Sequence, residues 1–322
     1  MKKIVVYRIC IVLLTVCLVG CGGQEPSVRT IELPKKDLIP EGTAFNETTN
    51  SIYVGSIYRQ KIIEITIDGE VRDLLGQDLF GELSPVGIEF DDSNHTLWIN
   101  MALSPVVNQT LAEEWKTGLM AYDIKKKVSW HYLLEDSLPS FFNDLTVLPN
   151  GDVIITETAN ARLFRFDATI QKLQLYANLE ETNFPNGITY HEPSRNLFVS
   201  TNQGIVKIDM VSKEQTLLNV ADGINATVID GLSLHENYFI GHQSSKITRF
   251  YVDKSFTTLT ESDVFDSGPE FDSSTTGEVG DGFYHYIVNS QIRSGVENKR
   301  IKPLDSLETI LIRSKLLASD KK

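Results

Sequence analysis

Short runs in which apolar and polar residues alternate cover most of the chain beyond residue 38. Two examples are Leu163-Phe164-Arg165-Phe166 and Ile205-Val206-Lys207-Ile208, and polar turn residues separate such runs. Alternation with a period of two is typical of β-strands, and no part of this region keeps the 3.6-residue period of an amphipathic helix. The pattern therefore predicts an all-β fold.

A longer repeat is superimposed on this alternation. Six segments begin with a lead residue, usually followed by Gly, and continue as an alternating apolar run; the third has Asp144 in place of that Gly. Successive lead residues are 43 to 46 positions apart, with one longer step of 57, and they are Glu41, Val86, Asn143, Asn186, Asp230 and Thr276. Turns divide most intervals into four short strands. This period and this strand content are typical of the blades of a β-propeller.

Six lead motifs predict six four-stranded blades around a central channel. Such a ring must close to bury its edge strands, and we expect Ile31-Glu32-Leu33 and Thr309-Ile310-Leu311-Ile312 to be the closing strands. A β-sandwich is the alternative all-β fold, but it does not explain the recurring lead motif. The sequence therefore predicts a six-bladed β-propeller.

The N-terminus has a different character from the rest of the chain. Three basic residues precede an apolar run, Ile9 to Val19, that is too short to span a bilayer as a helix. Leu18-Val19-Gly20-Cys21 then looks like a bacterial lipoprotein signal, although an ordinary secretory signal cleaved nearby is the alternative. Lipidation of Cys21 would anchor the protein to the bacterial cell envelope. The expected organisation is a signal peptide (1–20), a lipidated Cys and tether (21–37), a propeller (38–316) and a tail (317–322).

Composition narrows the classes of partner. The chain has 30 basic and 43 acidic residues and a formal net charge of −13, and removal of the signal would make it more acidic. This balance argues against binding to nucleic acid or to anionic lipid and suits a protein that binds cations. Because Cys10 and Cys17 lie in the signal, the mature chain would have no internal disulfide, no thiolate metal site and no cysteine nucleophile beyond Cys21.

The lead residues are candidate metal ligands. The first strand of every propeller blade lines the channel, so Glu41, Asn143, Asn186 and Asp230 would bring carboxylate and amide oxygens together at one mouth. Such groups repel or stay unsatisfied unless something fills the space, and Ca²⁺ prefers oxygen ligands. The absence of nitrogen and sulfur ligands disfavours Zn²⁺ and Cu²⁺. The alternative for each copy is a residue that only starts a turn.

The same motifs carry a family resemblance across the mature domain. Pro40-Glu41-Gly42, Asn143-Asp144, Pro185-Asn186-Gly187 and Asp230-Gly231 resemble those of the senescence-marker-protein, gluconolactonase and regucalcin-like six-bladed propellers. The Glu, Asn, Asn, Asp order is also similar to that of diisopropyl fluorophosphatase and the paraoxonases. The resemblance implies a catalytic Ca²⁺ or other divalent ion held by Glu41, Asn143, Asn186 and Asp230.

The resemblance also implies metal-assisted hydrolysis of a lactone or phosphoester. Asp230 is the expected base or nucleophile, or else only a metal ligand. Asp144 resembles the paraoxonase residue that reaches a second ion, but Gly42 stands where another acid would help. His242 follows an apolar strand and is a candidate proton shuttle, with a rim hydrogen-bonding role as the alternative.

The loops between second and third strands should lie on the same face as the lead residues. Residues expected at this pocket rim are Arg59, Glu157, Asn202, Gln243 and Asn289. In the second blade this loop is long, 102–117, and either covers the site or packs on the rim. The sixth copy has a further long loop, 293–306. The rim lacks a clear pair of arginines for a sugar substrate, with only Arg59 and Arg162 as candidates, so sugar-lactone specificity is not predicted.

Three functions compete on this sequence. The first is an envelope-anchored, Ca²⁺-dependent hydrolase acting on a lactone or related ester. The second is a non-catalytic binding propeller with a structural metal ion. A metal-free propeller similar to strictosidine synthase is the third, and the acidic Glu41 and Asp230 disfavour it.

Overall fold

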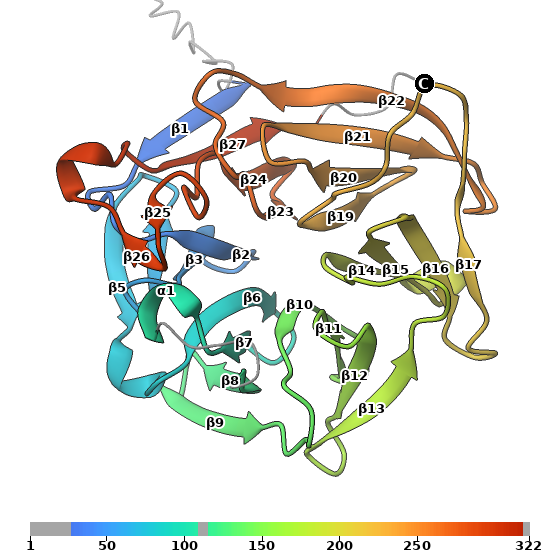
Figure 1. The fold of residues 1–322 in the computed structure, drawn as a ribbon, viewed down its shortest axis with the longest axis horizontal. Helices are drawn as coiled ribbons and strands as arrows, with labels where there is room; N and C mark the ends of the chain where they lie inside the picture. Colours follow the sequence, from blue (N-terminus) through green and yellow to red (C-terminus); the bar gives the residue numbers. More distant parts are fainter. Residues whose placement is uncertain (1–26, 109–114, 318–322) are drawn as a thin grey trace, which may run out of the picture.

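The computed structural model describes residues 27–108 and 115–317, and in them the prediction of a six-bladed β-propeller is confirmed. Figure 1 shows six sheets arranged in a ring around a central channel. The expected signal peptide and Cys21 lie outside the described residues. No helix in the described part of the chain is long and apolar enough to cross a membrane.

Each blade is an antiparallel sheet whose first-named strand is the inner one. Blades one to three are β2 (Pro40–Asn46), β3 (Ser51–Ser56), β4 (Lys61–Thr66) and β5 (Val71–Leu75); β6 (Ser84–Asp91), β7 (Thr96–Ala102), β8 (Thr117–Asp123) and β9 (Val128–Leu133); and β10 (Phe142–Val147), β11 (Val153–Glu157), β12 (Arg162–Asp167) and β13 (Lys172–Asn178).

Blades four and five follow the same order, and blade six is completed by the first strand of the chain. They are β14 (Ile188–His191), β15 (Asn196–Thr201), β16 (Gly204–Asp209) and β17 (Gln215–Leu217); β19 (Leu232–His235), β20 (Tyr238–His242), β21 (Lys246–Val252) and β22 (Thr258–Ser267); and β23 (Gly277–Gly280), β24 (Phe283–Ile287), β27 (Leu311–Leu316) and β1 (Val28–Glu32). The short β18 (Asn219–Val220) adds to β22 in parallel.

The two ends of the chain close the ring, as the sequence predicted. β1 pairs antiparallel with β27, from Val28 opposite Lys315 to Glu32 opposite Leu311. This pairing gives blade six its fourth, outer strand, so the sheet at the closure of the ring is as complete as the other sheets. Because β1 belongs to the sheet, the propeller begins before the expected boundary at residue 38.

The core lies between neighbouring blades. Between blades one and two, Tyr53 and Ile62 pack in one buried cluster with Ile88, Leu97 and Met120. Comparable clusters join the other blades. Middle strands such as β3 therefore bury both faces, and inner strands such as β14 and β23 are half-buried at most positions. Outer strands such as β9 and β13 keep exposed residues at several positions.

The Gly after the lead residue is required by the close approach of neighbouring inner strands. A Cβ at Gly231 would lie 2.7 Å from the carbonyl oxygen of Thr275, and one at Gly187 would lie 2.5 Å from that of Asp230. Gly42 and Gly87 likewise leave no room for a methyl group against the next blade. The lead motif thus marks the positions where six inner strands converge.

Two insertions project from the face at which the inner strands begin. The loop between β7 and β8 holds the short helix α1 (Pro105–Asn108), and the loop between β24 and β27 holds the hairpin β25 (Val296–Glu297) and β26 (Arg300–Ile301). α1 contacts β26, as Figure 1 shows near blade one. Short 3₁₀ turns occupy Gln77–Leu79, Glu192–Ser194 and Leu304–Ser306.

Candidate functional site

The lead residues occupy one mouth of the channel because strand register places them there. The start of β2 pairs with the end of β3 through Pro40 and Ser56, and the start of β10 pairs with the end of β11 through Phe142 and Glu157. Inner-strand starts and the following second-to-third-strand loops therefore share one face of the ring.

Asn186 and Asp230 are in direct contact at this mouth. Asn186 Nδ2 donates a hydrogen bond to Asp230 Oδ1 over 2.7 Å. Both residues line a cavity of about 170 Å³ together with Asn202 and Arg293. Arg293, in the turn before β25, is a charged cavity residue that the strand pattern did not single out, because it comes from a blade insertion rather than from the repeat.

The backbone carbonyl groups of Asn186, Glu41 and Asp230 are held by the neighbouring blades. Thr156 Oγ1 donates to the carbonyl oxygen of Asn186 over 2.7 Å, and Thr275 and Thr276 donate to that of Glu41 over 2.8 and 2.6 Å. Gly187 N donates to the carbonyl oxygen of Asp230 over 2.8 Å. These bonds run between adjacent blades, so the ring holds the lead side chains in place before any ligand binds.

Glu41 lies at the mouth in surroundings that disfavour its negative charge. It is only 9% exposed, and its Oε2 has no hydrogen-bond partner among the described residues. Burial raises the pKa of Glu41 well above its usual range, and the carboxylates of Asp230 and Asp144 raise it further, against a smaller opposing effect of Arg293. A cation near Oε2 would remove this penalty.

Asp230 and Asn143 differ in how far their polar atoms are already engaged. Burial raises the pKa of Asp230 to about 6, while the hydrogen bond from Asn186 and the charge of Arg293 oppose the shift. Asn143 Nδ2 donates a hydrogen bond to Thr158 Oγ1 over 3.1 Å.

The carboxylates at the mouth do not form a metal site by themselves. In residues 27–108 and 115–317, no three His, Cys, Asp or Glu side chains lie close enough to hold an ion together. An ion bound by Glu41 and Asp230 would therefore need the amide oxygens of Asn143 and Asn186 as well.

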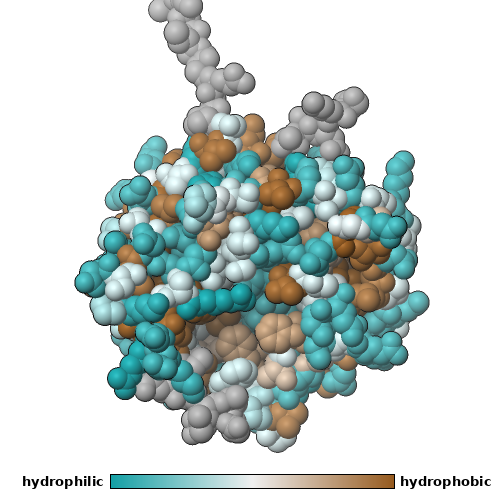
Figure 2. All heavy atoms as spheres, turned by 45° about the horizontal axis from the view of Figure 1, so that its top comes forward, coloured by the Kyte–Doolittle hydropathy of each residue, from teal (hydrophilic) through white to brown (hydrophobic). Residues whose placement is uncertain are grey.

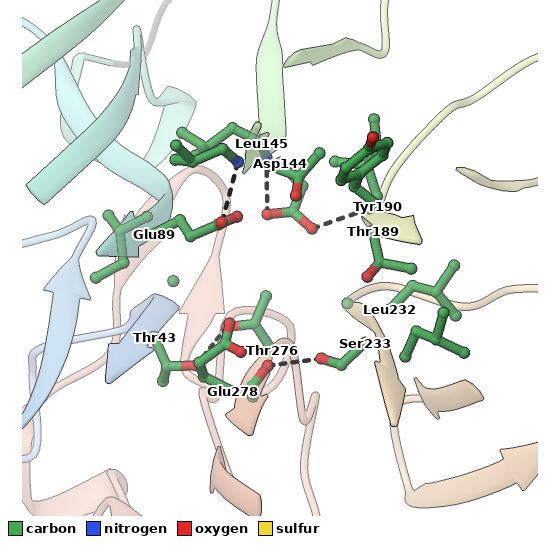
Figure 3. A pocket seen from close by; sticks show the side chains of 18 residues that line it. Thr43, Glu89, Asp144, Leu145, Thr189, Tyr190, Leu232, Ser233, Thr276 and Glu278 are labelled. Atoms are coloured by element: carbon green, nitrogen blue, oxygen red, sulfur yellow. Dashed lines mark hydrogen bonds between the residues drawn. The ribbon is translucent and has the colours of Figure 1, made fainter. Parts of the chain in front are cut away.

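A second group of carboxylates lies in the channel itself. Figure 3 shows Glu89, Asp144 and Glu278 around a cavity of about 210 Å³. Asp144 Oδ1 and Oδ2 accept bonds from the backbone nitrogens of Leu145 and Ile188 over 2.9 and 3.1 Å. Asp144 thus stabilises the next inner strand where other blades have Gly.

These channel acids are held in an unfavourable environment. Burial raises the pKa of Asp144 and of Glu278 to about 7, and burial together with the charge of Glu278 raises the pKa of Glu89 well above its usual range. The repeat of lead residues does not single out Glu89 or Glu278. Each is nevertheless a charged residue within the inner strand of its blade, which was the available signal.

His242 does not lie at the rim, and its expected role as a proton shuttle needs correction. The side chain is fully buried, with Nδ1 2.9 Å from Ser274 Oγ and Nε2 2.8 Å from Tyr284 Oη. Burial lowers the pKa of His242 to about 3. Its backbone carbonyl accepts from Asp230 N over 2.8 Å, so His242 supports Asp230 from behind.

Of the residues expected at the rim, only Asn202 lines the cavity with Asn186 and Asp230. Glu157 is fully buried and pairs with Arg162 over 2.9 Å. The other three bind elsewhere, with Arg59 paired to Asp37, Gln243 donating to the carbonyl oxygens of Asn225 and Thr227, and Asn289 donating to that of Thr309. The strand pattern located their loops but not the direction of their side chains.

Comparison with known proteins shows the fold of this chain but does not assign the chain to a family. No family model matches the chain, and no curated protein matches it by sequence. A gluconolactonase of Xanthomonas campestris is similar in structure, with a TM-score of 0.61, 13% identity and coverage of 90% of each chain. Virginiamycin B lyase of Staphylococcus aureus has a TM-score of 0.59 and 16% identity, over 90% of this chain and 99% of that chain.

A third similar structure has a different activity again. Aldose sugar dehydrogenase of Streptomyces coelicolor, described in its PQQ-bound form, has a TM-score of 0.60 and 11% identity, over 91% of this chain and 99% of that chain. At such identities the likeness shows the propeller fold alone, and function must be argued from the site.

Proposed function

We propose that this protein is a divalent-cation-dependent hydrolase that acts on a lactone or related carboxylic ester at the channel mouth. The observation that carries the proposal is the buried Glu41 carboxylate, whose Oε2 has no partner among the described residues and whose charge is opposed by Asp230 and Asp144. Likeness to gluconolactonase structures agrees with a lactone substrate.

The donor set at the mouth suits a hard cation. Glu41, Asp230, Asn143 and Asn186 would supply oxygen ligands only, which favours Ca²⁺ over softer metals. When bound, the ion would polarise the substrate carbonyl and stabilise the oxyanion that forms. A second ion at Asp144 would need ligands other than Glu89 and Glu278, because no three acidic side chains of the described residues lie close enough to hold an ion together.

The chain's own residues provide the rest of the chemistry. Asn186 orients the Asp230 carboxylate through the 2.7 Å hydrogen bond. Without a bound cation the pKa of Asp230 is about 6, so the carboxylate is already mostly ionised at neutral pH and can accept a proton from water. Arg293 lines the same cavity and would attract an anionic substrate or product.

The principal test is hydrolysis of a lactone and ester panel with Ca²⁺ and with chelator. Asn186→Ala should weaken Ca²⁺ binding and kcat/KM by at least about tenfold, since it loses a ligand and the group that orients Asp230. Asn94→Ala, in an exposed turn, is the matched control. Both variants need unchanged circular dichroism.

Non-catalytic binding is the second candidate function. The observation in its favour is that Asp230 is the one acidic residue lining the cavity with Asn186, and the same carboxylate is a proposed metal ligand, so no separate general base lies beside it among the described lining residues. Tight Ca²⁺ binding in calorimetry, with no turnover of any panel member, would support this function and contradict the hydrolase.

We also propose that the chain is lipid-anchored at the bacterial cell envelope through Cys21, on the periplasmic or surface face. The sequence Leu18-Val19-Gly20-Cys21 supports this. Metabolic labelling with a fatty acid should mark the wild-type protein, and Cys21→Ala should remove the label and release the protein from membranes. An unlabelled wild-type protein would contradict the proposal.

A further inference from the structure

An apolar cavity of about 400 Å³ lies beside the polar mouth. Its walls come from five parts of the chain that are distant in sequence: Ile57 after β3, Val86 of β6, Trp115 before β8, Phe141 before β10, and Ile292 and Val296 from the blade-six insertion. Figure 2 shows a hollow with hydrophobic residues inside it on the face that it displays.

Two features connect this cavity to the proposed catalytic residues. Val86 is the lead residue of blade two, and its carbonyl oxygen lies against Gly42, directly after Glu41. Ile292 lines the apolar cavity while the next residue, Arg293, lines the polar cavity with Asn186 and Asp230. The two cavities are therefore adjacent and share one strip of the blade-six insertion.

The walls indicate what kind of group fits. Trp115 and Phe141 pack with ring centroids 5.5 Å apart, and most other lining side chains are aliphatic. Such walls offer few partners to the hydroxyl groups of a sugar, which would lose hydrogen bonds to water on entry. An alkyl or aryl group would instead gain from leaving water.

The wall also holds three polar residues, Ser84, Ser104 and Lys299. The hydroxyl of Ser84 and the indole nitrogen of Trp115 are buried without a partner among the described residues, so neither atom faces the open part of the cavity. The surface that a bound molecule meets is therefore mainly apolar.

We propose that the substrate is an amphipathic ester or lactone whose alkyl or aryl substituent occupies this cavity while its ester group lies at Glu41, Asn186 and Asp230. The proposal rests on the proposed hydrolase for the position of the ester group. The cavity itself can be tested by binding alone. A volume of about 400 Å³ is within the range of small-molecule pockets.

The test uses γ-lactones with side chains from methyl to octyl and, independently, the fluorescent probe anilinonaphthalene sulfonate. Each added methylene should raise kcat/KM about fourfold until the cavity is full. The same lactones should displace the probe in order of chain length, a measurement that needs no turnover.

Val296→Trp is the decisive variant, because the larger side chain would fill the cavity from the exposed hairpin β25–β26. It should remove the chain-length dependence and weaken probe binding by about tenfold, roughly the loss of two buried methylenes. Val264→Trp places the same substitution on the outer strand β22, where Val264 is exposed, and should change neither measurement.

The outcomes separate this proposal from the proposed function. If the lactones displace the probe in order of chain length without being hydrolysed, and Val296→Trp removes this effect, the cavity proposal is supported and the hydrolase proposal is contradicted. Two results would overturn the cavity proposal and leave the hydrolase proposal intact. One is hydrolysis with the same kcat/KM for every lactone of the series. The other is a Val296→Trp protein whose dependence on chain length is unchanged. No hydrolysis together with no displacement overturns both.

Discussion

Replacement of Glu278 by Gln should stabilise the protein at alkaline pH. Glu278 is on β23 and borders the channel cavity, where its Oε1 accepts from Val279 N over 2.9 Å. Burial and the nearby Asp144 and Glu47 raise its pKa from 4.5 to about 7, against the effect of that hydrogen bond. Gln keeps an acceptor for Val279 and has no charge to bury.

The sign of the pH dependence follows from proton binding. Because the folded-state pKa is raised, the folded protein binds more protons than the unfolded chain between about pH 4.5 and about pH 7. The favourable contribution of protonated Glu278 is fully present below pH 4.5 and is lost as the pH rises through 7. Wild-type stability should therefore fall over this window.

The magnitude can be worked from the same shift. A change from 4.5 to about 7 corresponds to at most about 3 to 4 kcal/mol in the free energy of unfolding. Solvent that enters the channel cavity would screen the charge, so a gain of about 1 to 2 kcal/mol for Glu278→Gln at pH 8.5 is the expectation. At pH 4 the variant and the wild type should be nearly equal.

The assay is urea unfolding at several pH values between 4 and 8.5, with chelator present so that no cation binds the channel. Glu261→Gln, an exposed position on β22, is the control and should leave the stability curve unchanged. Equal stabilities of wild type and Glu278→Gln at pH 8.5 would refute the reasoning, because the ionised carboxylate would then cost nothing in the channel.

Three further substitutions test other parts of the argument. Gly187→Ala should lower the melting temperature strongly in thermal unfolding, because the methyl group would meet the backbone of the next blade. Gly55→Ala is the control and should have a small effect, since its Cβ would lie 3.5 Å from the nearest atom. Arg162→Met should destabilise the protein by about 3 kcal/mol in urea unfolding, since it leaves the buried Glu157 without its cation; a loss below about 1 kcal/mol would contradict this. His242→Gln should lower stability yet leave the shape of the pH profile of kcat/KM unchanged, and a shifted profile would restore a catalytic role.

The blades could be predicted because their signal is local and repeated. Alternation at Ile205-Val206-Lys207-Ile208 reflects two faces of one strand, and the glycines after the lead residues reflect contacts that recur in several blades. Closure by β1 followed from the need to cover an edge. The sequence alone therefore determined the ring and the face on which Asn186 and Asp230 meet.

Only the tertiary structure decided which polar side chains face a cavity. Glu157 and His242 have the residue types of a site, but buried partners in their own and adjacent blades bind them instead. Arg293 and the apolar walls near Val296 come from insertions without a repeat, and their position depends on contacts between segments far apart in sequence. The periodicity of the sequence shows which side chains of each strand are buried. The direction of a loop side chain depends instead on neighbouring residues that are brought together only in the closed ring.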